Sequence, residues 1–258
     1  MGNPRPTVRV GVFIPKEAQL LDAACVDILA TAGHDYLSLC KGLVPPHIID
    51  LAPTVEVLYV SQLPAGAAVP LTAGARLLVD RHLSSPDVAP GTLDVVLVPG
   101  PDPAAAHDAV ALEWLAAHHA AAETGGGRGT DVLCVCTGIF LCGEAGILKG
   151  RRACGPRGMQ DLLAKRFEGV TWVGEELRWV RDGNLWSSGG ITNGNDLVSA
   201  YIRQSPLFPG PVVEMALIMA DTGDRPQKYG QSKPVFVMSV LWTLFRGLVM
   251  SIRRPKYT

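Results

Sequence analysis

Apolar residues gather in short runs along the first half of the chain, and longer mixed segments separate these runs. Val8–Ile14, Leu93–Val98 and Val132–Val135 are apolar at most positions, as is typical of parallel strands buried on both faces. Residues 55–60 alternate between apolar and polar positions, which indicates a further strand. Because helical segments lie between the strands, the pattern predicts a doubly wound α/β fold, with a mostly parallel sheet flanked by helices.

The pattern changes in the second half of the chain. Residues 177–181 have strand character, and Asp182-Gly183 is a hairpin turn signal that leads into a further strand at 184–188. We therefore expect a small β-hairpin, followed by a loop of small residues at 189–196 and a helix that continues to Arg203.

Two earlier intervals carry weaker signals. Three prolines in residues 34–53 break any long helix, so this interval is predicted to be irregular. Residues 63–92 are rich in Gly, Pro and Ala, with one short strand candidate at 76–79.

The last apolar run, residues 235–252, is interrupted by Arg246 and three hydroxyl residues. One helical stripe collects the apolar positions Val237, Leu241, Leu244, Leu248 and Ile252. The run is short and interrupted for a transmembrane span. We interpret it as an extra C-terminal helix that docks on the sheet or on a second subunit, so that a homodimer is expected, with membrane attachment as the alternative.

Composition narrows the function classes. The chain has 258 residues, 48% apolar and 18% charged, and a net charge of −1, which suits one large α/β domain. Nucleic acid is not an expected partner, because the basic residues cluster only in a short tail at 253–256. The six cysteines contain no CxxC pair, so free thiols in a reducing compartment are predicted. With a polar beginning that lacks a signal peptide, the prediction is a cytoplasmic protein.

The strongest chemical signal is Cys136. It ends the apolar run 132–135, and small residues followed by a helical apolar run come directly after it. A strand that turns abruptly into a helix at a nucleophile is the logic of a nucleophile elbow, which places the side chain at the carboxyl edge of the sheet. The helix N-terminus is expected to favour the thiolate, and Gly138 is expected to let another backbone approach closely. Cys134 and Cys142 are interpreted as core residues.

Two carboxylates follow the first predicted strand and leave the same edge of the sheet. Either Asp22 or Glu17 could therefore meet Cys136. Asp22 also stands where a helix cap would stand, and the two roles are compatible.

Metal and nucleotide chemistry find no support in the sequence. There is no P-loop and no GxGxxG after a strand. His107, His118 and His119 lie on one predicted helix, but the adjacent pair points roughly 100° apart, which makes a poor metal site. We interpret these histidines as solvated and expect neither a metal nor another cofactor.

Five motifs together resemble the ThiJ/PfpI superfamily, which has the class I glutamine amidotransferase-like, flavodoxin-like fold. The motifs are Leu20–Asp22, Val98–Gly100, Cys136–Gly138, Ala145–Ala153 and Ser187–Thr192. Their order and spacing carry this resemblance over residues 8–205. Within the superfamily the chain is most similar to the isocyanide hydratase-like branch, where Cys-Thr/Ala-Gly replaces the Cys-His pair of the PfpI proteases and deglycases. We therefore expect a ThiJ/PfpI-like domain at 8–205 and a C-terminal helical extension at 206–258, which packs on the same domain or on a dimer partner.

The resemblance implies roles for individual residues. Cys136 matches the family nucleophile, which is commonly a readily oxidised thiol of low pKa, and Asp22 matches the acid that hydrogen-bonds it. The N–H groups of Gly100 and Thr137 would form an oxyanion pocket, and the Thr137 hydroxyl would steer the acid or the attacking water. The other positions expected to line the substrate pocket are Pro101, Gly138, Ile191 and Thr192.

Three departures from the family pattern matter. No histidine follows Cys136, so the Cys-His pair of the PfpI proteases is absent. Where related sequences often carry a histidine, this chain reads Cys154–Arg157. The segment at Asp22 is one residue shorter than usual, which leaves Glu17 as the alternative acid.

The leading functional hypothesis is a cofactor-independent hydratase or lyase that acts on a small electrophile, in the manner of an isocyanide hydratase. Cys136 would attack the electrophilic carbon, and Asp22 would act as general acid and base. Two alternatives use the same cysteine. One is a glyoxalase or deglycase activity on α-oxoaldehydes, and the other is a non-enzymatic redox-sensing or chaperone-like protein.

Overall fold

A seven-stranded sheet forms the centre of the computed structural model, which describes residues 5–124 and 129–253. The strand order is β10-β11-β7-β6-β1-β2-β5. The strands are β1 (Thr7–Phe13), β2 (Thr54–Ser61), β5 (Arg81–His82), β6 (Val95–Val98), β7 (Asp131–Val135), β10 (Trp179–Asp182) and β11 (Leu185–Ser188). Most of the basic tail lies outside the described residues. All neighbouring strands are parallel except β10 and β11, which form the expected hairpin.

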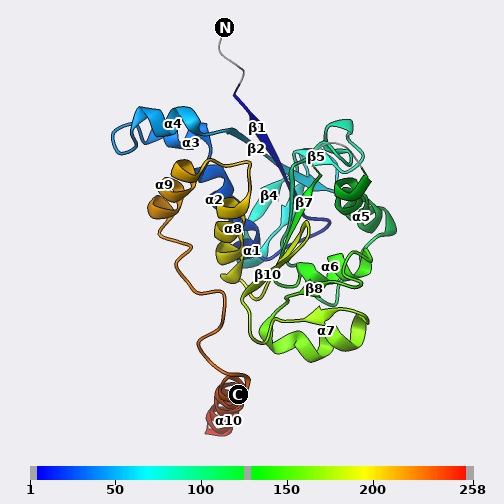
Figure 1. Cartoon of the computed structure of the whole chain (residues 1–258). Coiled ribbons are helices and arrows are strands. Elements are labelled where there is room, and N and C mark those ends of the chain that lie inside the picture. The colour runs from blue at the N-terminus through cyan, green and yellow to red at the C-terminus, as the bar shows by residue number, and fades with distance from the viewer. Residues whose placement is uncertain (1–4, 125–128, 254–258) are drawn as a thin grey trace.

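Helices cover both faces of the sheet, as Figure 1 shows. On one face lie α1 (Leu20–Ala24), α2 (Val26–Thr31), α3 (His34–Leu39), α4 (Pro46–Leu51), α8 (Asn193–Gln204) and α9 (Gly210–Ala220). On the other face lie α5 (Ala109–Thr124), α6 (Gly138–Glu144) and α7 (Gln160–Arg166). The doubly wound, mostly parallel α/β fold predicted from the sequence is therefore confirmed.

The apolar runs build two cores because successive side chains of a strand point to opposite faces. Leu97 and Leu133 enter the core beneath α2 and α8, whereas Val96 and Val132 enter the core beneath α5 and α6. All four are fully buried. Each such side chain stabilises the fold by about 1.5–3 kcal/mol relative to an exposed one.

Three local predictions were wrong or incomplete. Residues 34–53 are not irregular but contain α3 and α4, since Pro46 occupies the first turn of α4, where a missing N–H costs nothing. The candidate strand at 76–79 is β4 (Arg76–Leu78), and its partner β3 (Ala68–Pro70) was missed. His118 and His119 are buried rather than solvated, and the His118 ring lies against the Trp114 ring at a tilt of 55°.

The smaller elements connect the layers. They are the strands β8 (Arg152–Ala153) and β9 (Thr171–Trp172), which pair with each other, and the short helices η1 (Thr72–Gly74), η2 (Pro86–Val88) and η3 (Arg157–Met159).

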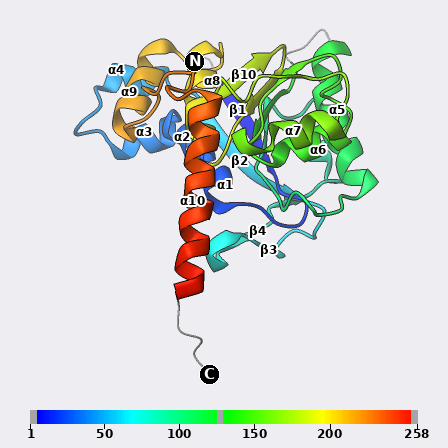
Figure 2. The same ribbon diagram turned by 90° about the horizontal axis from the view of Figure 1, so that it is seen from below.

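The C-terminal region consists of two dissimilar parts. Helix α9 packs into the core through Val213 and Leu217. Helix α10 (Lys233–Arg253) stands apart from the body of the molecule, and its carboxyl end reaches beyond the domain (Figure 1 and Figure 2). By length and apolar composition, α10 is the one helix in the described residues that could cross a membrane, and none of that window is buried.

Gly138 provides a test of how tightly the fold holds the start of α6. A Cβ at this position would collide with the Val98 carbonyl oxygen of β6, and backbone cannot move aside as a flexible side chain can. We expect Gly138→Ala to lower the free energy of unfolding by about 2 kcal/mol, measured by urea denaturation. Gly210→Ala is the matched control, because a Cβ there meets nothing within 4 Å; equal stability of the two variants would contradict this packing.

Candidate active site

Cys136 stands in the turn between β7 and α6. Its backbone φ is +56°, a left-handed conformation that a residue with a side chain adopts only when its surroundings impose it. The turn lifts the side chain to the carboxyl edge of the sheet, half-buried at the surface of the domain. This is the strand-to-helix elbow that the sequence pattern indicates.

Asp22 and Gly100 come to Cys136 from the two neighbouring strands. The loop after β1 leads into α1, where Asp22 is fully buried. The loop after β6 carries Gly100, whose N–H donates a 3.1 Å hydrogen bond to Asp22 Oδ2. A Cβ on Gly100 would lie 2.6 Å from the same carboxylate oxygen, so only glycine fits between the two loops.

Burial dominates the electrostatics of the pair. It raises the pKa of Asp22 to about 6, although hydrogen bonds from the Gly100 N–H and the Cys136 side chain act in the opposite direction. Burial and the negative charge of Asp22 likewise raise the pKa of Cys136 to about 11, although hydrogen bonds from the backbone N–H groups of Ile191 and Thr137 lower it. At neutral pH the arrangement is therefore a thiol beside a carboxylate. This differs from the expected thiolate, since the first turn of a seven-residue helix does not outweigh burial.

The oxyanion donors also differ from the sequence prediction. The Gly100 N–H is already engaged by Asp22, so it does not provide a free donor to a substrate. The two N–H groups that meet the sulfur belong to Thr137 and Ile191. Ile191, like Cys136, has a positive φ of 36°.

The Thr137 hydroxyl has a structural task. It donates a 2.6 Å hydrogen bond to the carbonyl oxygen of Pro101 and so ties the loop after β6 to the elbow. Its proton is therefore not available to steer an acid or a water molecule, while its oxygen can still accept a hydrogen bond.

A cavity of about 330 Å³ opens over Cys136. Of the predicted site residues, Gly100, Pro101, Thr137 and Ile191 line it, and Asp22 and Gly138 lie buried behind it. The sequence analysis missed four lining residues, Gln19, Thr72, Asp102 and Pro103. Thr72 lies in the turn between β3 and β4, and the proline- and glycine-rich composition of that turn was its only signal.

Glu17 and Thr192 have other places in the structure. Glu17 lines the cavity, but its Oε1 accepts a hydrogen bond from the backbone N–H of Asp102, so the carboxyl group that interacts with Cys136 is Asp22. Thr192 does not line the cavity over Cys136 but lines a separate one. Cys154, which stands where relatives often have histidine, is buried and donates to the Leu177 carbonyl oxygen.

Comparisons with known proteins agree with this geometry. A model of the DJ-1/PfpI family matches residues 28–204. An isonitrile hydratase of Pseudomonas putida is 35% identical over 138 residues, 53% of this chain and 55% of that protein. This match spans about half the length of the curated relative. Cys136 and Gly100 lie inside the family match and Asp22 lies just before it, so the place of Asp22 in the site rests on the geometry.

Solved structures share the fold. A ThiJ/PfpI family protein from Pseudomonas syringae superposes with a TM-score of 0.64 at 21% identity, covering 95% of this chain and 90% of that one. Drosophila melanogaster DJ-1beta superposes with a TM-score of 0.59 at 18% identity, covering 84% of this chain and 98% of that one.

Asp22→Asn tests the electrostatic cost of the site. The folded-state pKa of Asp22, about 6, lies above its ordinary value of 3.8, so its contribution to stability is complete below the lower value and is lost as pH rises through the upper one. We expect D22N to raise the free energy of unfolding by about 1–3 kcal/mol at slightly alkaline pH. At a pH near 3.8, the ordinary pKa of the carboxyl group, we expect D22N to change this free energy little. Thermal unfolding across this pH range measures the difference.

Asp27→Asn is the control for this experiment, because Asp27 is exposed on the neighbouring helix. The buried-carboxylate interpretation would be contradicted if D27N raised the free energy of unfolding as much as D22N does. It would also be contradicted if the increase in D22N did not depend on pH.

Proposed function

The chain belongs to the DJ-1/PfpI family, and on that premise we propose that it is a hydratase that adds water to a small isocyanide by means of Cys136 and Asp22. The observation that carries the proposal is the thiol of Cys136, which stands beside a buried carboxyl group at the floor of a cavity. The resemblance to an isonitrile hydratase, a name for the same activity, supports the choice of substrate class.

The first step joins the sulfur to the substrate. Asp22 accepts the thiol proton as the Cys136 sulfur attacks the terminal carbon of the isocyanide. Asp22 then returns that proton to the same carbon, and a thioimidate bound through sulfur results. The raised pKa of Asp22 suits this double role, since a group whose pKa is near 6 both takes and gives a proton close to neutral pH.

The second step releases the product. A water molecule attacks the thioimidate carbon, and one of its protons passes through Asp22 to the substrate nitrogen. Asp22 then takes the remaining hydroxyl proton as the formamide carbonyl forms and the C–S bond breaks. Sulfur leaves with the electron pair and receives that second proton from Asp22. The N–H groups of Thr137 and Ile191 stabilise negative charge on the sulfur in both steps.

The electrostatics favour an enzyme over a redox sensor. Peroxide reacts with thiolate rather than thiol, and burial together with Asp22 raises the pKa of Cys136 to about 11. A general base beside the thiol supplies the thiolate during the reaction instead. A cavity of about 330 Å³ also exceeds what a sensor of peroxide needs.

Activity of the Cys136 and Asp22 variants tests the proposal. We expect wild type to convert an aryl isocyanide to the N-formamide, and C136S to lose at least about a thousandfold in kcat/KM because the hydroxyl is a far weaker nucleophile at this pH. Wild-type kcat/KM is expected to rise with pH around the pKa of Asp22, about 6, and D22N should lack this dependence. Product formation is followed by mass spectrometry.

Cys40→Ser is the matched control, since Cys40 is a half-buried free cysteine that does not line the site cavity. Full turnover by C136S would overturn the mechanism. Conversion of methylglyoxal to lactate, without any formamide from the isocyanide, would replace the hydratase by the glyoxalase alternative.

A further inference from the structure

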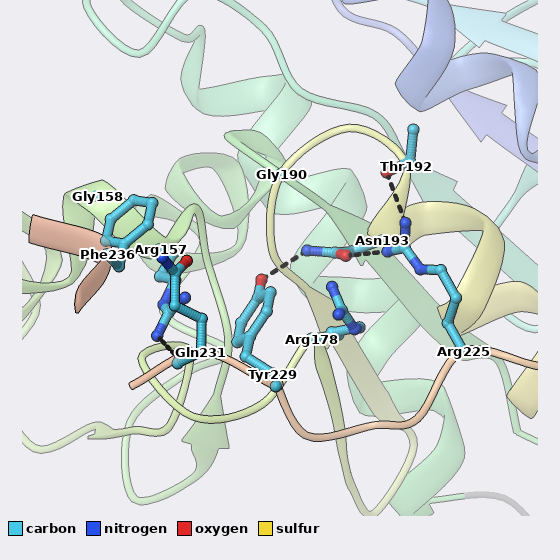
Figure 3. Close-up of a pocket in the computed structure, with 11 residues that line it drawn as sticks. Arg157, Gly158, Arg178, Gly190, Thr192, Asn193, Arg225, Tyr229, Gln231 and Phe236 are labelled. Carbon is cyan, nitrogen blue, oxygen red and sulfur yellow. Dashed lines mark hydrogen bonds between the residues drawn. The ribbon is translucent and has the colours of Figure 1, made fainter. Parts of the chain in front are cut away.

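A second cavity, of about 480 Å³, is lined by Gly190 and Thr192, the two sequence neighbours of Ile191, which lines the cavity over Cys136. Three arginines enter it from different parts of the chain: Arg157 from η3, Arg178 from the residue before β10, and Arg225 from the segment between α9 and α10. In Figure 3 Arg157 and Arg178 lie on opposite sides of the Tyr229 ring, and Arg225 reaches Thr192 and Asn193 at the start of α8. Its lining contains no acidic residue among the described side chains.

Arg157 and Arg225 are held in place by neighbouring groups. Arg157 is buried and donates to the carbonyl oxygens of Glu175 and Gln231. Arg225 donates to Asn193 Oδ1 and forms an ion pair with Asp196, both at 2.6 Å. These two guanidinium groups are therefore pre-positioned at opposite ends of the cavity, which lowers the entropy lost when a ligand binds.

Arg178 differs from the other two. Its Nε donates to the Pro226 carbonyl oxygen, and its guanidinium group stacks over the Tyr229 ring at 4.6 Å. Arg157 also stacks on Tyr229, at 4.5 Å, so two cations share one aromatic ring. In the described part of the chain Arg178 forms no ion pair with a carboxylate, and its two terminal nitrogens keep their donors for a ligand.

We propose that this cavity binds the phosphate group of a small molecule. Arginine presents paired donors that match tetrahedral oxyanions. Arg157 lies 3.9 Å from a Glu175 carboxylate oxygen and Arg225 pairs with Asp196, so Arg178 leaves a net positive charge at the cavity that an anion would neutralise. Thr192 and Asn193 at the start of α8 accept hydrogen bonds from Arg225 and so hold its guanidinium group at the cavity. A carboxylate ligand is expected to bind less tightly, because it offers fewer acceptors and less charge.

Calorimetric titration of the full chain with inorganic phosphate, at neutral pH and constant ionic strength, tests the site. We expect saturable binding that R178Q weakens at least about tenfold, with a smaller loss in R178K, which keeps the charge but not the paired donors. R76Q, at an exposed arginine of β4 outside the cavity, should bind as wild type does. Acetate should bind more weakly than phosphate.

Absence of saturable binding by wild type up to about 20 mM phosphate, or an equal affinity in R178Q, would overturn the proposal. Thermal unfolding of each variant shows whether Arg178 is also needed for folding. If R178Q proves unfolded, the R178K affinity decides the outcome, and an unchanged value counts against the site.

Helix α10 carries a second, independent inference. Ten large apolar side chains between Val235 and Met250 are at least 41% exposed. Near its beginning the helix is attached to the domain, since Lys233 forms ion pairs with Glu175 and Asp161 and Arg157 stacks on Phe236. Water cannot solvate such a surface favourably, so something apolar has to cover the rest of the helix.

The distribution of side chains identifies the cover. A second protein helix would cover one stripe, and the stripe that includes Leu241, Leu244 and Leu248 would suit it. Met238, Trp242 and Phe245 would then still face water. The side that carries Arg246 also carries Ser239 and Thr243 besides the apolar Val235 and Met250. The two hydroxyls donate to helix carbonyl oxygens, of Phe236 and Ser239, and so need no outside partner. Apolar side chains thus cover more of the helix than the one stripe that a partner helix would use.

We infer that α10 is a single span that anchors the protein in a lipid bilayer. Within its 21 residues, the apolar run 235–252 extends for about 27 Å, close to the thickness of the hydrocarbon core. In the sequence Lys228 and Lys233 precede this run and Arg253 follows it, and basic residues that flank a span are favourable near lipid headgroups. Arg246 is the main unfavourable residue, at about 2.5–3.5 kcal/mol, and its long side chain can extend toward the carboxyl-terminal headgroups.

Flotation of the full-length chain with vesicles of phosphatidylcholine and phosphatidylserine tests the anchor. We expect the protein to float with the vesicles and to resist extraction by high salt and by alkaline carbonate, as a spanning helix does. Leu244→Arg places a second charge in the span and should reduce the floating fraction at least about fivefold. Leu43→Arg is the control, because Leu43 is 81% exposed on the catalytic domain.

Extraction of wild type by carbonate would overturn the span. A monodisperse dimer that stays in solution without detergent, whose dimerisation is abolished by L244R but not by L43R, would overturn it in favour of a second copy of the chain.

Discussion

The site depends on one buried carboxyl group. Asp22 has no exposed surface, and burial opposes its ionisation more strongly than the Gly100 amide and the Cys136 side chain favour it. The neighbouring residues are arranged around this group: Gly100 has no side chain to collide with it, and Cys136 adopts a left-handed conformation beside it. The fold thus places a carboxylate and a thiol in contact in a desolvated site, where burial raises the pKa of both groups and brings that of Asp22 to about 6, close to neutral pH.

The strand order explains how these residues meet. β1 is adjacent to β6, and β6 is adjacent to β7, so the segments that follow the three strands lie side by side at one edge of the sheet. Asp22, Gly100 and Cys136 each come from one of these segments. Gly138 allows α6 to start against the β6 backbone, which keeps the elbow close to the loop of Gly100.

The segment 189–192 separates two surfaces of different chemistry. Ile191 offers its N–H to the sulfur of Cys136, while Thr192 faces the cavity with three arginines. The chain after α9 completes that cavity with Arg225 and Tyr229 and then continues into α10. Phe236 belongs to both the cavity lining and the first turn of α10. The two proposals together therefore place the phosphate-binding cavity next to the membrane surface, where the anchor helix begins.

The sequence by itself determined the sheet, the hairpin and the elbow, because buried runs, the Asp-Gly turn and a cysteine between strand and helix are local signals. It also placed Asp22 and Gly100 at the carboxyl edge of the sheet, where Cys136 lies. Only the tertiary structure decided that the Gly100 N–H serves Asp22 rather than a substrate, and that burial keeps Cys136 a thiol. Desolvation and the pairing of distant loops depend on the folded environment, which neither spacing nor composition records. For the same reason the stripe along residues 235–252 predicted a helix docked on the sheet or on a second subunit, and only the structure shows that the sheet of the same chain does not cover this helix.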